Sequence, residues 1–472
     1  MQNEGSRAGA IDRILSYFDE GGFDEELGRR VRIRTESQKR DSVPELHRYL
    51  DEEIIPAFKV MGFECTKYDN PLNRGGPFLL ASRMEGSGLP VVLGYGHGDV
   101  ILGQDEQWKK GSGPWEIQRD GDRLYGRGTA DNKAQHTINM AALRAVIEER
   151  GSLGFNAKFL IEMGEEAGSA GLRELLELHK EAFSADVFIG SDGPRMSPAR
   201  PTITLGSRGA LNFDLRVELR DGGHHSGNWG GLIADPAIIL SHALASITTA
   251  SGQIKIKEWL PPPTLESVQR VLEGLEIEAG PGAPEIDPDW GEPGMTPAAK
   301  VYGWNSFAVL AMKAGNPENP VNAIAPSASA HCQLRFFAGT NADTILESLR
   351  THLDSNGFPQ VEIVTPEENN AGFAASRTEP DHPWVESVFS SIESTINEKP
   401  AVIPSMGGSI CNDLFTDLLG LPAIWIPHSY AACSQHAPDE HILLSLTRSA
   451  LPLMTGLYWD IGDGKVPSVS SE

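Results

Sequence analysis

The sequence predicts an α/β protein in which helices flank a mixed, largely parallel sheet and a smaller α+β domain is inserted. Apolar strand-like runs alternate with helical patterns through the first 190 residues, which is typical of βαβ units and a parallel sheet. Residues 210–219 then alternate strictly between apolar and polar side chains, as in a sheet with one solvated face. A buried-type strand returns at 423–426, so the second domain interrupts the first.

The first domain is predicted from the spacing of its apolar residues. Helical spacing is found at 10–18, 43–58, 134–149 and 172–179, and strand-like runs lie at 78–81, 91–95, 155–163 and 186–189. Gly151 is expected to end the helix at 134–149, because glycine is the residue most often found just after a helix.

The second domain is predicted as a ferredoxin-like sandwich, which has the element order β-α-β-β-α-β. Its strands are expected at 210–219, 307–312, 330–336 and 361–364, and its helices at 235–250 and 342–353. Eight prolines between residues 255 and 300 predict a long insertion there, with one helix at 265–275. The predicted domains are therefore residues 1–206 and 379–472 for the first domain and 207–378 for the inserted one.

Composition restricts the classes of partner. At 472 residues, two domains are expected, and no apolar run is long enough to span a bilayer. A net charge of −25 argues against binding to nucleic acid or an anionic membrane. The polar start of the chain does not resemble a secretory signal, and its four cysteines form no C-x-x-C pair. A reducing, cytoplasmic setting is the expectation.

Acidic and imidazole side chains directly follow three of the predicted strands: His97 and Asp99, Glu165 and Glu166, and Asp192. The carboxyl ends of strands are where open α/β sheets place their binding crevice. A histidine and a carboxylate with one residue between them suit a metal ligand and its orienting group, because a ligating histidine usually donates its other N–H to a carboxylate. These observations predict a metal site.

Five motifs occur in a fixed order: His97-x-Asp99, Gly126-Arg127-Gly128-x-x-Asp131-Asn132-Lys133, Glu165-Glu166, Ser191-Asp192-Gly193 and a late His436. In this order they resemble the co-catalytic metallopeptidases of the M20 type, which include carnosinase-like dipeptidases, carboxypeptidase G2 and aminoacylases. The resemblance covers nearly the whole chain and implies a zinc-exopeptidase-like catalytic domain with an inserted lid. Gly98, where that family more often has Tyr, Thr or Met, and the proline-rich insertion depart from its pattern.

The resemblance implies two divalent metal ions. Asp131 is then the bridging ligand, His97 and Asp192 complete one site, and Glu166 and His436 complete the other. Such a pair of ions, about 3.5 to 4 Å apart, activates a bound water and polarises a substrate carbonyl. Carboxylate and imidazole ligands without thiolate suit Zn²⁺ first, with Mn²⁺ or Co²⁺ as alternatives.

Two further acidic residues receive catalytic roles from the resemblance. Asp99 is expected to orient the metal-binding histidine. Glu165 is expected to act as the general base, which takes a proton from the attacking water and passes it to the leaving nitrogen.

Substrate recognition is also inferred from the resemblance. His225, in His225-Ser226-Gly227, matches a lid histidine that completes the active site of the partner subunit, which implies a homodimer. Arg335 matches an arginine that binds the substrate's carboxylate, a role suited to its forked donors. Four other residues match pocket positions: Gly408, Ser409, His382 and Asn322.

Several of these residues also have a plain structural interpretation. A Glu-Glu pair is usually a solvated helix turn, Asp192 suits a turn beside Gly193-Pro194, and Arg335 suits an exposed strand position. The order of the motifs favours the functional interpretation for the metal ligands. His428 and His441 are expected to be structural.

The sequence therefore predicts a dinuclear metal-dependent hydrolase that cleaves the amide bond of a small substrate ending in a carboxylate, as a dipeptidase or carboxypeptidase does. One alternative is an amidohydrolase or deaminase of the same fold acting on an N-acyl amino acid, a carbamoyl group or an aryl amine. The other is a noncatalytic metal-binding protein. Such a protein is expected to have lost a metal ligand or the general base, but the sequence has all five ligand candidates and the base.

Overall fold

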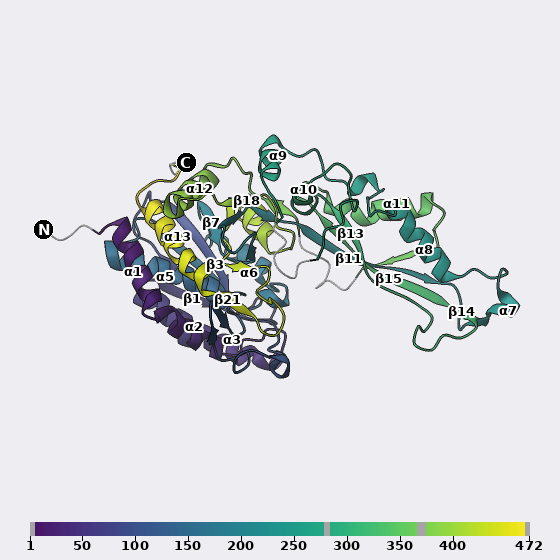
Figure 1. Cartoon of the computed structure of the whole chain (residues 1–472), viewed down its shortest axis with the longest axis horizontal. Coiled ribbons are helices and arrows are strands. Elements are labelled where there is room, and N and C mark those ends of the chain that lie inside the picture. The colour runs from purple at the N-terminus through teal and green to yellow at the C-terminus, as the bar shows by residue number, and fades with distance from the viewer. Residues whose placement is uncertain (1–4, 278–283, 366–373, 468–472) are drawn as a thin grey trace.

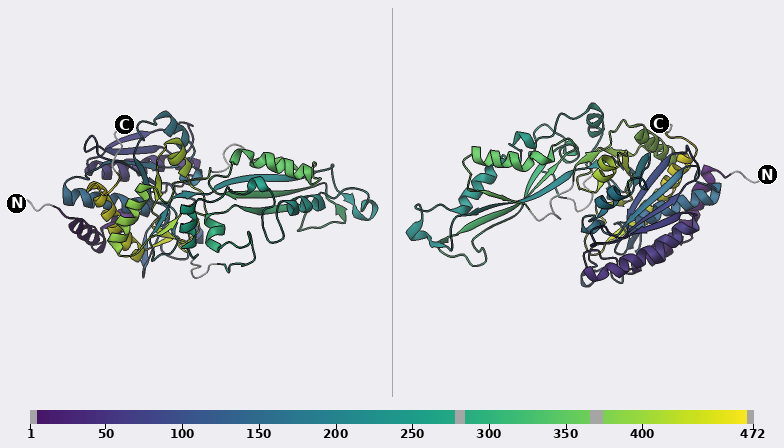
Figure 2. Two further views of the ribbon diagram at one scale, coloured as in Figure 1. Left: turned by 90° about the horizontal axis from the view of Figure 1, so that it is seen from above. Right: turned by 180° about the vertical axis from the view of Figure 1, so that it is seen from behind.

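The computed structural model describes residues 5–277, 284–365 and 374–467. Elements from both ends of the chain form one body, and the middle of the chain forms an arm that extends away from it (Figure 1). The same division is visible from above and from behind (Figure 2). Among the described residues, no helix has the length and apolar character needed to cross a membrane.

An eight-stranded mixed sheet forms the centre of the body. In spatial order its strands are β1 (Glu64–Tyr68), β2 (Phe78–Arg83), β6 (Asn156–Glu162), β3 (Val91–His97), β7 (Val187–Gly190), β19 (Ala423–Trp425), β9 (Thr202–Thr204) and β18 (Ala401–Ile403). The pairs β3–β6, β3–β7, β7–β19 and β9–β18 are parallel, whereas β1–β2, β2–β6 and β9–β19 are antiparallel. The predicted mixed, largely parallel sheet is confirmed.

Helices cover both faces of this sheet because its strands are apolar on both sides. In β2, Leu79 and Ala81 face one hydrophobic core, and Phe78 and Leu80 face the other. The helices on the first face are α1 (Arg7–Asp19), α2 (Gly22–Arg32), α3 (Val43–Tyr49), α4 (Ile55–Val60), α5 (Lys133–Arg150), α12 (Pro383–Ile396) and α13 (Leu444–Gly462). The second face is covered by α6 (Leu172–Leu178) and the short helix η7 (Leu414–Leu418).

The central helix α5 follows its predicted pattern. Its apolar residues Ile138, Ala141, Ala142 and Val146 are buried, and Gly151 ends it with φ +86°. At its other end, a Cβ at Gly96 of β3 would lie 2.5 Å from the Cβ of His136. The glycine therefore lets α5 pack directly against the strand that ends at His97.

The arm contains a four-stranded antiparallel sheet in the order β13 (Ser306–Ala314), β15 (Ser327–Phe336), β11 (Gly209–Glu218), β16 (Glu362–Val364). Helices α8 (Pro236–Ile247) and α11 (Ile345–Ser355) pack on one face, over Phe213, Leu215 and Val217. The polar residues between these three lie on the other face, as the alternation predicts. We call this arm, from β11 to β16, the lid; its strand order and helices match the predicted ferredoxin-like sandwich.

Two paired segments of the chain connect the lid to the body. The chain leaves the body through β10 (Gly206–Ser207) and returns through β17 (Ser376–Arg377), and these two segments pair with each other. The domain boundaries at 206/207 and 378/379 stay predictions. At the far end of the lid, β12 (His224–His225) pairs with β14 (Ala323–Ile324) beside α7 (Ser226–Trp229) (Figure 1).

The proline-rich insertion is more helical than the sequence predicts. Besides α9 (Glu266–Glu273) it contains α10 (Pro297–Tyr302) and the single turn η5 (Lys257–Trp259). Helix α10 forms because the Thr296 side chain caps it and Pro297 occupies its first position, where a missing N–H costs nothing. Val268 and Ala298 then share a small core with Phe337 of the lid and Ile403 of β18. Part of the insertion, residues 278–283, lies outside the described residues.

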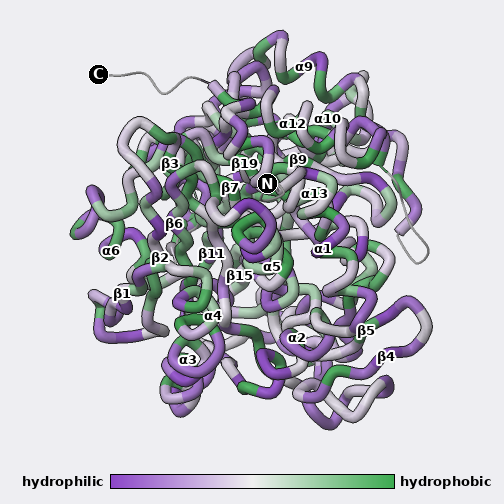
Figure 3. Tube along the Cα trace, turned by 90° about the vertical axis from the view of Figure 1, so that its left-hand side faces the viewer, coloured by the Kyte–Doolittle hydropathy of each residue, from purple (hydrophilic) through white to green (hydrophobic). Residues whose placement is uncertain are grey.

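Three smaller features complete the body. Two small sheets are formed by β21 (His441–Leu443), β5 (Arg123–Tyr125) and β4 (Gln118–Asp120), and by β20 (Ser429–Tyr430) and β8 (Pro194–Arg195). The body's single helical turns are η1 (Arg40–Ser42), η2 (Leu50–Ile54), η3 (Asp105–Gln107) and η4 (Glu165–Ala167), whereas η6 (Ala342–Thr344) is a single turn in the lid. Helix α2, which the sequence analysis does not predict, is largely hydrophilic in Figure 3, although Phe23, Leu27 and Val31 form a narrow buried apolar stripe at helical spacing.

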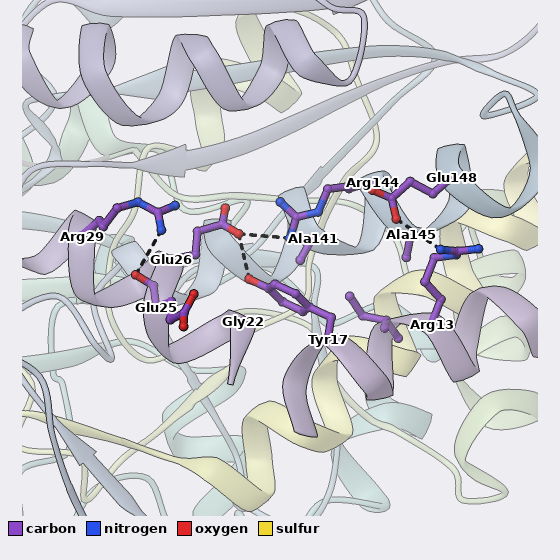
Figure 4. Close-up of a pocket in the computed structure, with 11 residues that line it drawn as sticks. Arg13, Tyr17, Gly22, Glu25, Glu26, Arg29, Ala141, Arg144, Ala145 and Glu148 are labelled. Carbon is purple, nitrogen blue, oxygen red and sulfur yellow. Dashed lines mark hydrogen bonds and ion pairs between the residues drawn. The ribbon is translucent and has the colours of Figure 1, made fainter. Parts of the chain in front are cut away.

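A buried ion cluster attaches α2 to its neighbours. Glu26 accepts hydrogen bonds from Arg30 (2.7 Å), Tyr17 (2.7 Å) and Arg144 (3.1 Å). Figure 4 shows Tyr17 from α1 and Arg144 from α5 reaching the same carboxylate beside a surface pocket. Burial alone raises the pKa of Glu26, but Arg30, Arg144 and the Tyr17 hydroxyl outweigh it and lower that pKa to about 2.

We predict that Glu26→Gln lowers the free energy of unfolding by about 3 kcal/mol at neutral pH, because it leaves Arg30 buried without a counter-charge. The folded-state pKa of Glu26 lies below its unfolded value, so this stabilisation is complete above about pH 4.5 and is lost as pH falls towards 2. Urea unfolding of metal-free protein from pH 6 to pH 3 tests this. The difference between wild type and variant should shrink with falling pH, whereas Glu25→Gln, which removes an exposed carboxylate, should behave like wild type. A constant difference across this range contradicts the prediction.

Candidate metal centre

Five of the predicted residues converge in two groups that share Asp131. His97, Asp131 and Asp192 form one group, and Asp131, Glu166 and His436 form the other. Within each group, one nitrogen or oxygen atom from every residue lies within 4.8 Å of the others. The shared carboxylate is the feature expected of a pair of adjacent cation sites.

Asp131 presents one oxygen to each histidine. Its Oδ1 lies 2.9 Å from His97 Nε2, and its Oδ2 lies 3.1 Å from His436 Nε2. Asp192 Oδ2 is 3.8 Å from His97 Nε2, and Glu166 Oε2 is 3.0 Å from His436 Nε2. Each group thus contains one imidazole and two carboxylates.

The fold brings these residues together at one edge of the central sheet. His97 is the last residue of β3, Glu166 lies in η4 just after β6, and Asp192 follows β7 by two residues. These three strands are adjacent and parallel, so their carboxyl ends meet. Asp131 comes just before α5, and His436 lies in the loop between β20 and β21.

The site concentrates negative charge in a buried place. Burial and the nearby Asp131 raise the pKa of Glu166 to about 7 and that of Asp192 to about 6. For Asp131 itself burial also raises the pKa, but hydrogen bonds from His436 and His97 outweigh it and hold that pKa well below its usual value. Buried carboxylates that repel one another in this way fit divalent cations, which remove the repulsion, and the oxygen and imidazole donors suit Zn²⁺, Mn²⁺ or Co²⁺.

Asp99 connects the histidine to the Glu-Glu pair. Its Oδ1 lies 3.4 Å from His97 Nδ1 and accepts a hydrogen bond from the Glu165 backbone N–H (3.2 Å), while Oδ2 accepts from the Glu166 N–H (3.1 Å). Asp99 is fully buried. It is therefore placed both to orient His97 and to hold the turn that carries Glu165 and Glu166.

Glu165 lies beside the two groups without belonging to either. Its Oε2 is 4.0 Å from His97 Nε2. Burial raises its pKa well above the usual value; His97 opposes this effect, and the Asp192 and Glu166 carboxylates add to it. On the open side, the His436 side chain is 53% exposed, so a small molecule can approach the shared Asp131 from solvent.

Glu440 is a site residue that the sequence analysis missed. Its carboxylate is buried and accepts hydrogen bonds from the backbone N–H groups of Gly128 (3.0 Å), Ala130 (2.9 Å) and Asp131 (3.1 Å). Arg127 completes the arrangement with an ion pair of 2.7 Å. Glu440 therefore fixes the backbone that presents Asp131, and its position four residues after His436 is the signal that could have identified it.

At the junction of lid and body, two arginines lie close to each other. Arg335 NH1 donates to Ser409 Oγ (3.2 Å), and Arg208 donates to the Gly407 carbonyl through Nε (3.0 Å) and NH2 (2.8 Å). Burial lowers the pKa of Arg208 to about 10, and the charge of Arg335 adds to this effect. The structure thus brings the predicted residues Arg335 and Ser409 together, and the predicted Gly408 beside them is exposed. Arg208 is a further residue at this junction that the sequence did not indicate.

Three predicted pocket residues lie elsewhere in the chain's own structure. His225 and Asn322 are exposed at the far end of the lid, where the Asn322 carbonyl accepts a hydrogen bond from Ser226 N (2.9 Å). His382 caps α12 by accepting a hydrogen bond from Trp384 N (3.2 Å). The contacts of these three residues do not include the two metal-ligand groups, so their predicted roles stay predictions.

The sequence matches one known family over most of its length: a model of peptidase family M20/M25/M40 fits residues 93–457. The chain belongs to this family. As the family implies, this M20 protein is a metal-dependent hydrolase, and the alternative of a noncatalytic protein finds no support. Two similar proteins are a cysteinylglycine-S-conjugate dipeptidase from Corynebacterium striatum, 29% identical over 68% of this chain and 70% of that protein, and a Beta-Ala-His dipeptidase from Mus musculus, 36% identical over 38% of this chain and 37% of that protein.

Solved structures show the same fold. Human carnosine dipeptidase 1 matches with a TM-score of 0.76 and 21% identity over 96% of this chain and 99% of that one. The M20 family metallo-carboxypeptidase Sso-CP2 from Sulfolobus solfataricus matches with a TM-score of 0.78 and 21% identity over 93% of this chain and 99% of that one. The M20 fold predicted from the motif order is confirmed.

We predict that Glu440→Gln weakens metal binding by about tenfold or more, because the amide has one acceptor oxygen instead of two and cannot accept from both Arg127 and the loop before α5. Zinc titration by calorimetry measures this. Asp439→Asn is the matched control, since the Asp439 carboxylate accepts from Lys109 N and Lys110 N instead. Affinities within about twofold of wild type for Glu440→Gln contradict the assigned role.

Proposed function

We propose that this M20 hydrolase is a dipeptidase that binds two divalent ions, Zn²⁺ first, at the edge of the body's central sheet. The observation that carries the proposal is the pair of ligand groups that share Asp131. The named activities of the bacterial and mouse relatives support dipeptides as the substrate class.

In this proposal, His97, Asp131 and Asp192 hold one ion, and Asp131, Glu166 and His436 hold the other. Bound ions of this kind supply a lowered water pKa and a polarised substrate carbonyl. Asp99 keeps His97 oriented through Nδ1, so that Nε2 faces Asp131.

Glu165 is the proposed general base. Its carboxylate lies next to both ligand groups but outside them, which leaves it free to accept a proton from the attacking water. The same carboxyl then donates that proton to the nitrogen of the departing amine, and the peptide bond breaks. Partial burial of Glu165 supports this role, because burial raises the pKa of its carboxyl, and a raised pKa helps the carboxyl keep the proton until it passes to the nitrogen.

Arg335 and Ser409 are the proposed site for the substrate's terminal carboxylate, with Arg208 and Gly408 beside them. Among the residues described, neither arginine forms an ion pair with a protein carboxylate, although Arg335 is half-buried and Arg208 is buried. Two poorly solvated guanidinium groups without an acid favour an anionic ligand, and a guanidinium pairs well with a planar carboxylate.

We also propose a homodimer formed through the lid. Strand β13 is an edge of the lid sheet and exposes Val309 (44%), Leu310 (54%) and Met312 (48%). An exposed apolar edge strand favours pairing with another chain. His225 and Asn322, at the far end of the lid, would then be available to the partner subunit, and His382 stays a pocket residue of lower priority.

A reducing, cytoplasmic location is part of the proposal. Cys65, Cys332, Cys411 and Cys433 are all free thiols, and the last three are buried. Free buried cysteines suit a compartment in which disulfides do not form.

Replacement of the base tests the proposed mechanism. We predict that Glu165→Gln lowers kcat for dipeptides by about 10²–10⁴-fold and leaves two ions bound per chain, because it removes a proton acceptor and no ligand. The assay pairs dipeptide and N-acyl amino acid hydrolysis with metal analysis, and Glu174→Gln on α6 is the control. Near-normal turnover by Glu165→Gln disproves the role of Glu165 as general base. If the wild-type enzyme cleaves N-acyl amino acids faster than dipeptides, the proposed dipeptidase activity is wrong.

The carboxylate site is tested with a neutral substrate. We predict that Arg335→Met raises KM for a dipeptide by about tenfold or more and leaves KM for the C-terminally amidated dipeptide unchanged, because the amide lacks the charge that Arg335 pairs with. Arg216→Met, which removes an exposed arginine from the lid, should affect neither substrate. An equal rise in KM for both substrates contradicts carboxylate recognition by Arg335.

A further inference from the structure

Three arginines are among the largest fully buried side chains: Arg30, Arg127 and Arg195. Arg30 pairs with Glu26 and Arg127 pairs with Glu440, each at 2.7 Å. Arg195 differs, because it forms no ion pair with any described carboxylate, and burial alone lowers its pKa to about 10. A guanidinium stays charged in proteins, so Arg195 is a buried positive charge without a protein counter-charge.

The hydrogen bonds of Arg195 are few and long. Nε donates to the Pro427 carbonyl (3.2 Å), and NH1 is 3.4 Å from both the Pro198 carbonyl and Ser449 Oγ. NH2 has no partner among the described residues. A buried charged group with an unsatisfied donor costs several kcal/mol, which is why such groups are normally paired.

His428 is a neighbour of Arg195. It directly precedes β20, the strand that pairs with β8, and it directly follows Pro427, whose carbonyl accepts a hydrogen bond from Arg195. The His428 ring is 0% exposed, and within the described parts of the chain neither of its nitrogens has a hydrogen-bond partner. Burial and the charge of Arg195 hold its pKa well below the usual value, so the ring is neutral and carries one N–H donor.

Two enclosed side chains thus leave donors unused beside one uncompensated positive charge. A water molecule would accept hydrogen bonds from these donors but would not neutralise the charge of Arg195. An anion would accept the hydrogen bonds and neutralise the charge. Because protein interiors leave few voids larger than a water molecule, a monoatomic anion suits the space between these packed side chains better than a carboxylate or sulfate does. We propose that Arg195 and His428 form a buried binding site for a halide ion, with chloride as the natural ligand.

This site supports the loop that carries Asp192. Arg195 follows Asp192 by three residues, and Ser429 Oγ, next to His428, donates to the Gly193 carbonyl (3.0 Å). A halide held by both Arg195 and His428 therefore links the two segments that support this loop. The inference concerns protein stability and does not depend on the proposed peptidase activity.

Thermal unfolding tests the proposal. The metal-loaded protein is unfolded in sodium chloride from 0 to 200 mM, with sodium gluconate added to keep ionic strength constant. A site that binds chloride in the folded state raises Tm by about 1–3 °C in a saturable way. Arg195→Met should abolish this dependence. Arg200→Met, which removes a partly exposed arginine that donates to the Lys399 carbonyl, should retain it.

Bromide diffraction locates the ion directly and does not require a folded variant. Crystals of wild-type protein soaked in bromide should give an anomalous peak between Arg195 NH2 and the His428 ring. Equal Tm values of wild type in chloride and gluconate overturn the proposal, as does a chloride dependence that survives in Arg195→Met. A water molecule instead of bromide at this position also overturns it.

Discussion

The structure depends on one shared carboxylate. Asp131 directs one oxygen to His97 and the other to His436, and two further acids, Asp192 and Glu166, crowd against it in a buried place. Such an arrangement is stable only where the surrounding structure fixes it and positive charge offsets the repulsion. Asp99 and Glu440 hold these acids in place, because their carboxylates accept hydrogen bonds from the backbone N–H groups of the turns that carry Glu166 and Asp131.

Two of the three largest fully buried arginines are paired with a buried acid. Arg30 is matched by Glu26 between α1, α2 and α5, and Arg127 is matched by Glu440 beside the metal centre. Arg195 has no such partner among the residues described, which is why we propose that an anion from solution neutralises its charge. In each place the cost of burying a charge determines which residues lie next to it.

Recognition and chemistry are divided between the two parts of the chain. The body holds the ligand groups and Glu165, whereas the lid supplies Arg335 at the junction. His225 lies in β12, which pairs with β14 at the end of the lid that points away from the body (Figure 1). The long lid with its exposed edge strand β13 is therefore best explained by the proposed homodimer, in which one lid reaches the other subunit.

The sequence by itself determined the fold class, most elements and the five ligand candidates, because hydrophobic periodicity and motif order are local properties of the chain. It predicted α5 with its Gly151 end and the alternating strand β11, but it missed α2 and α10. In α2 the apolar stripe of Phe23, Leu27 and Val31 is narrow and lies among charged residues, and α10 is a short helix in a proline-rich segment. Tertiary structure alone decided that Glu440 holds the Asp131 loop, that Arg208 lies beside Arg335, and that Arg195 NH2 and the His428 ring nitrogens have no hydrogen-bond partner among the described residues. These are contacts between residues up to some 300 positions apart, and a pairwise contact of that kind leaves no periodic signal in the sequence.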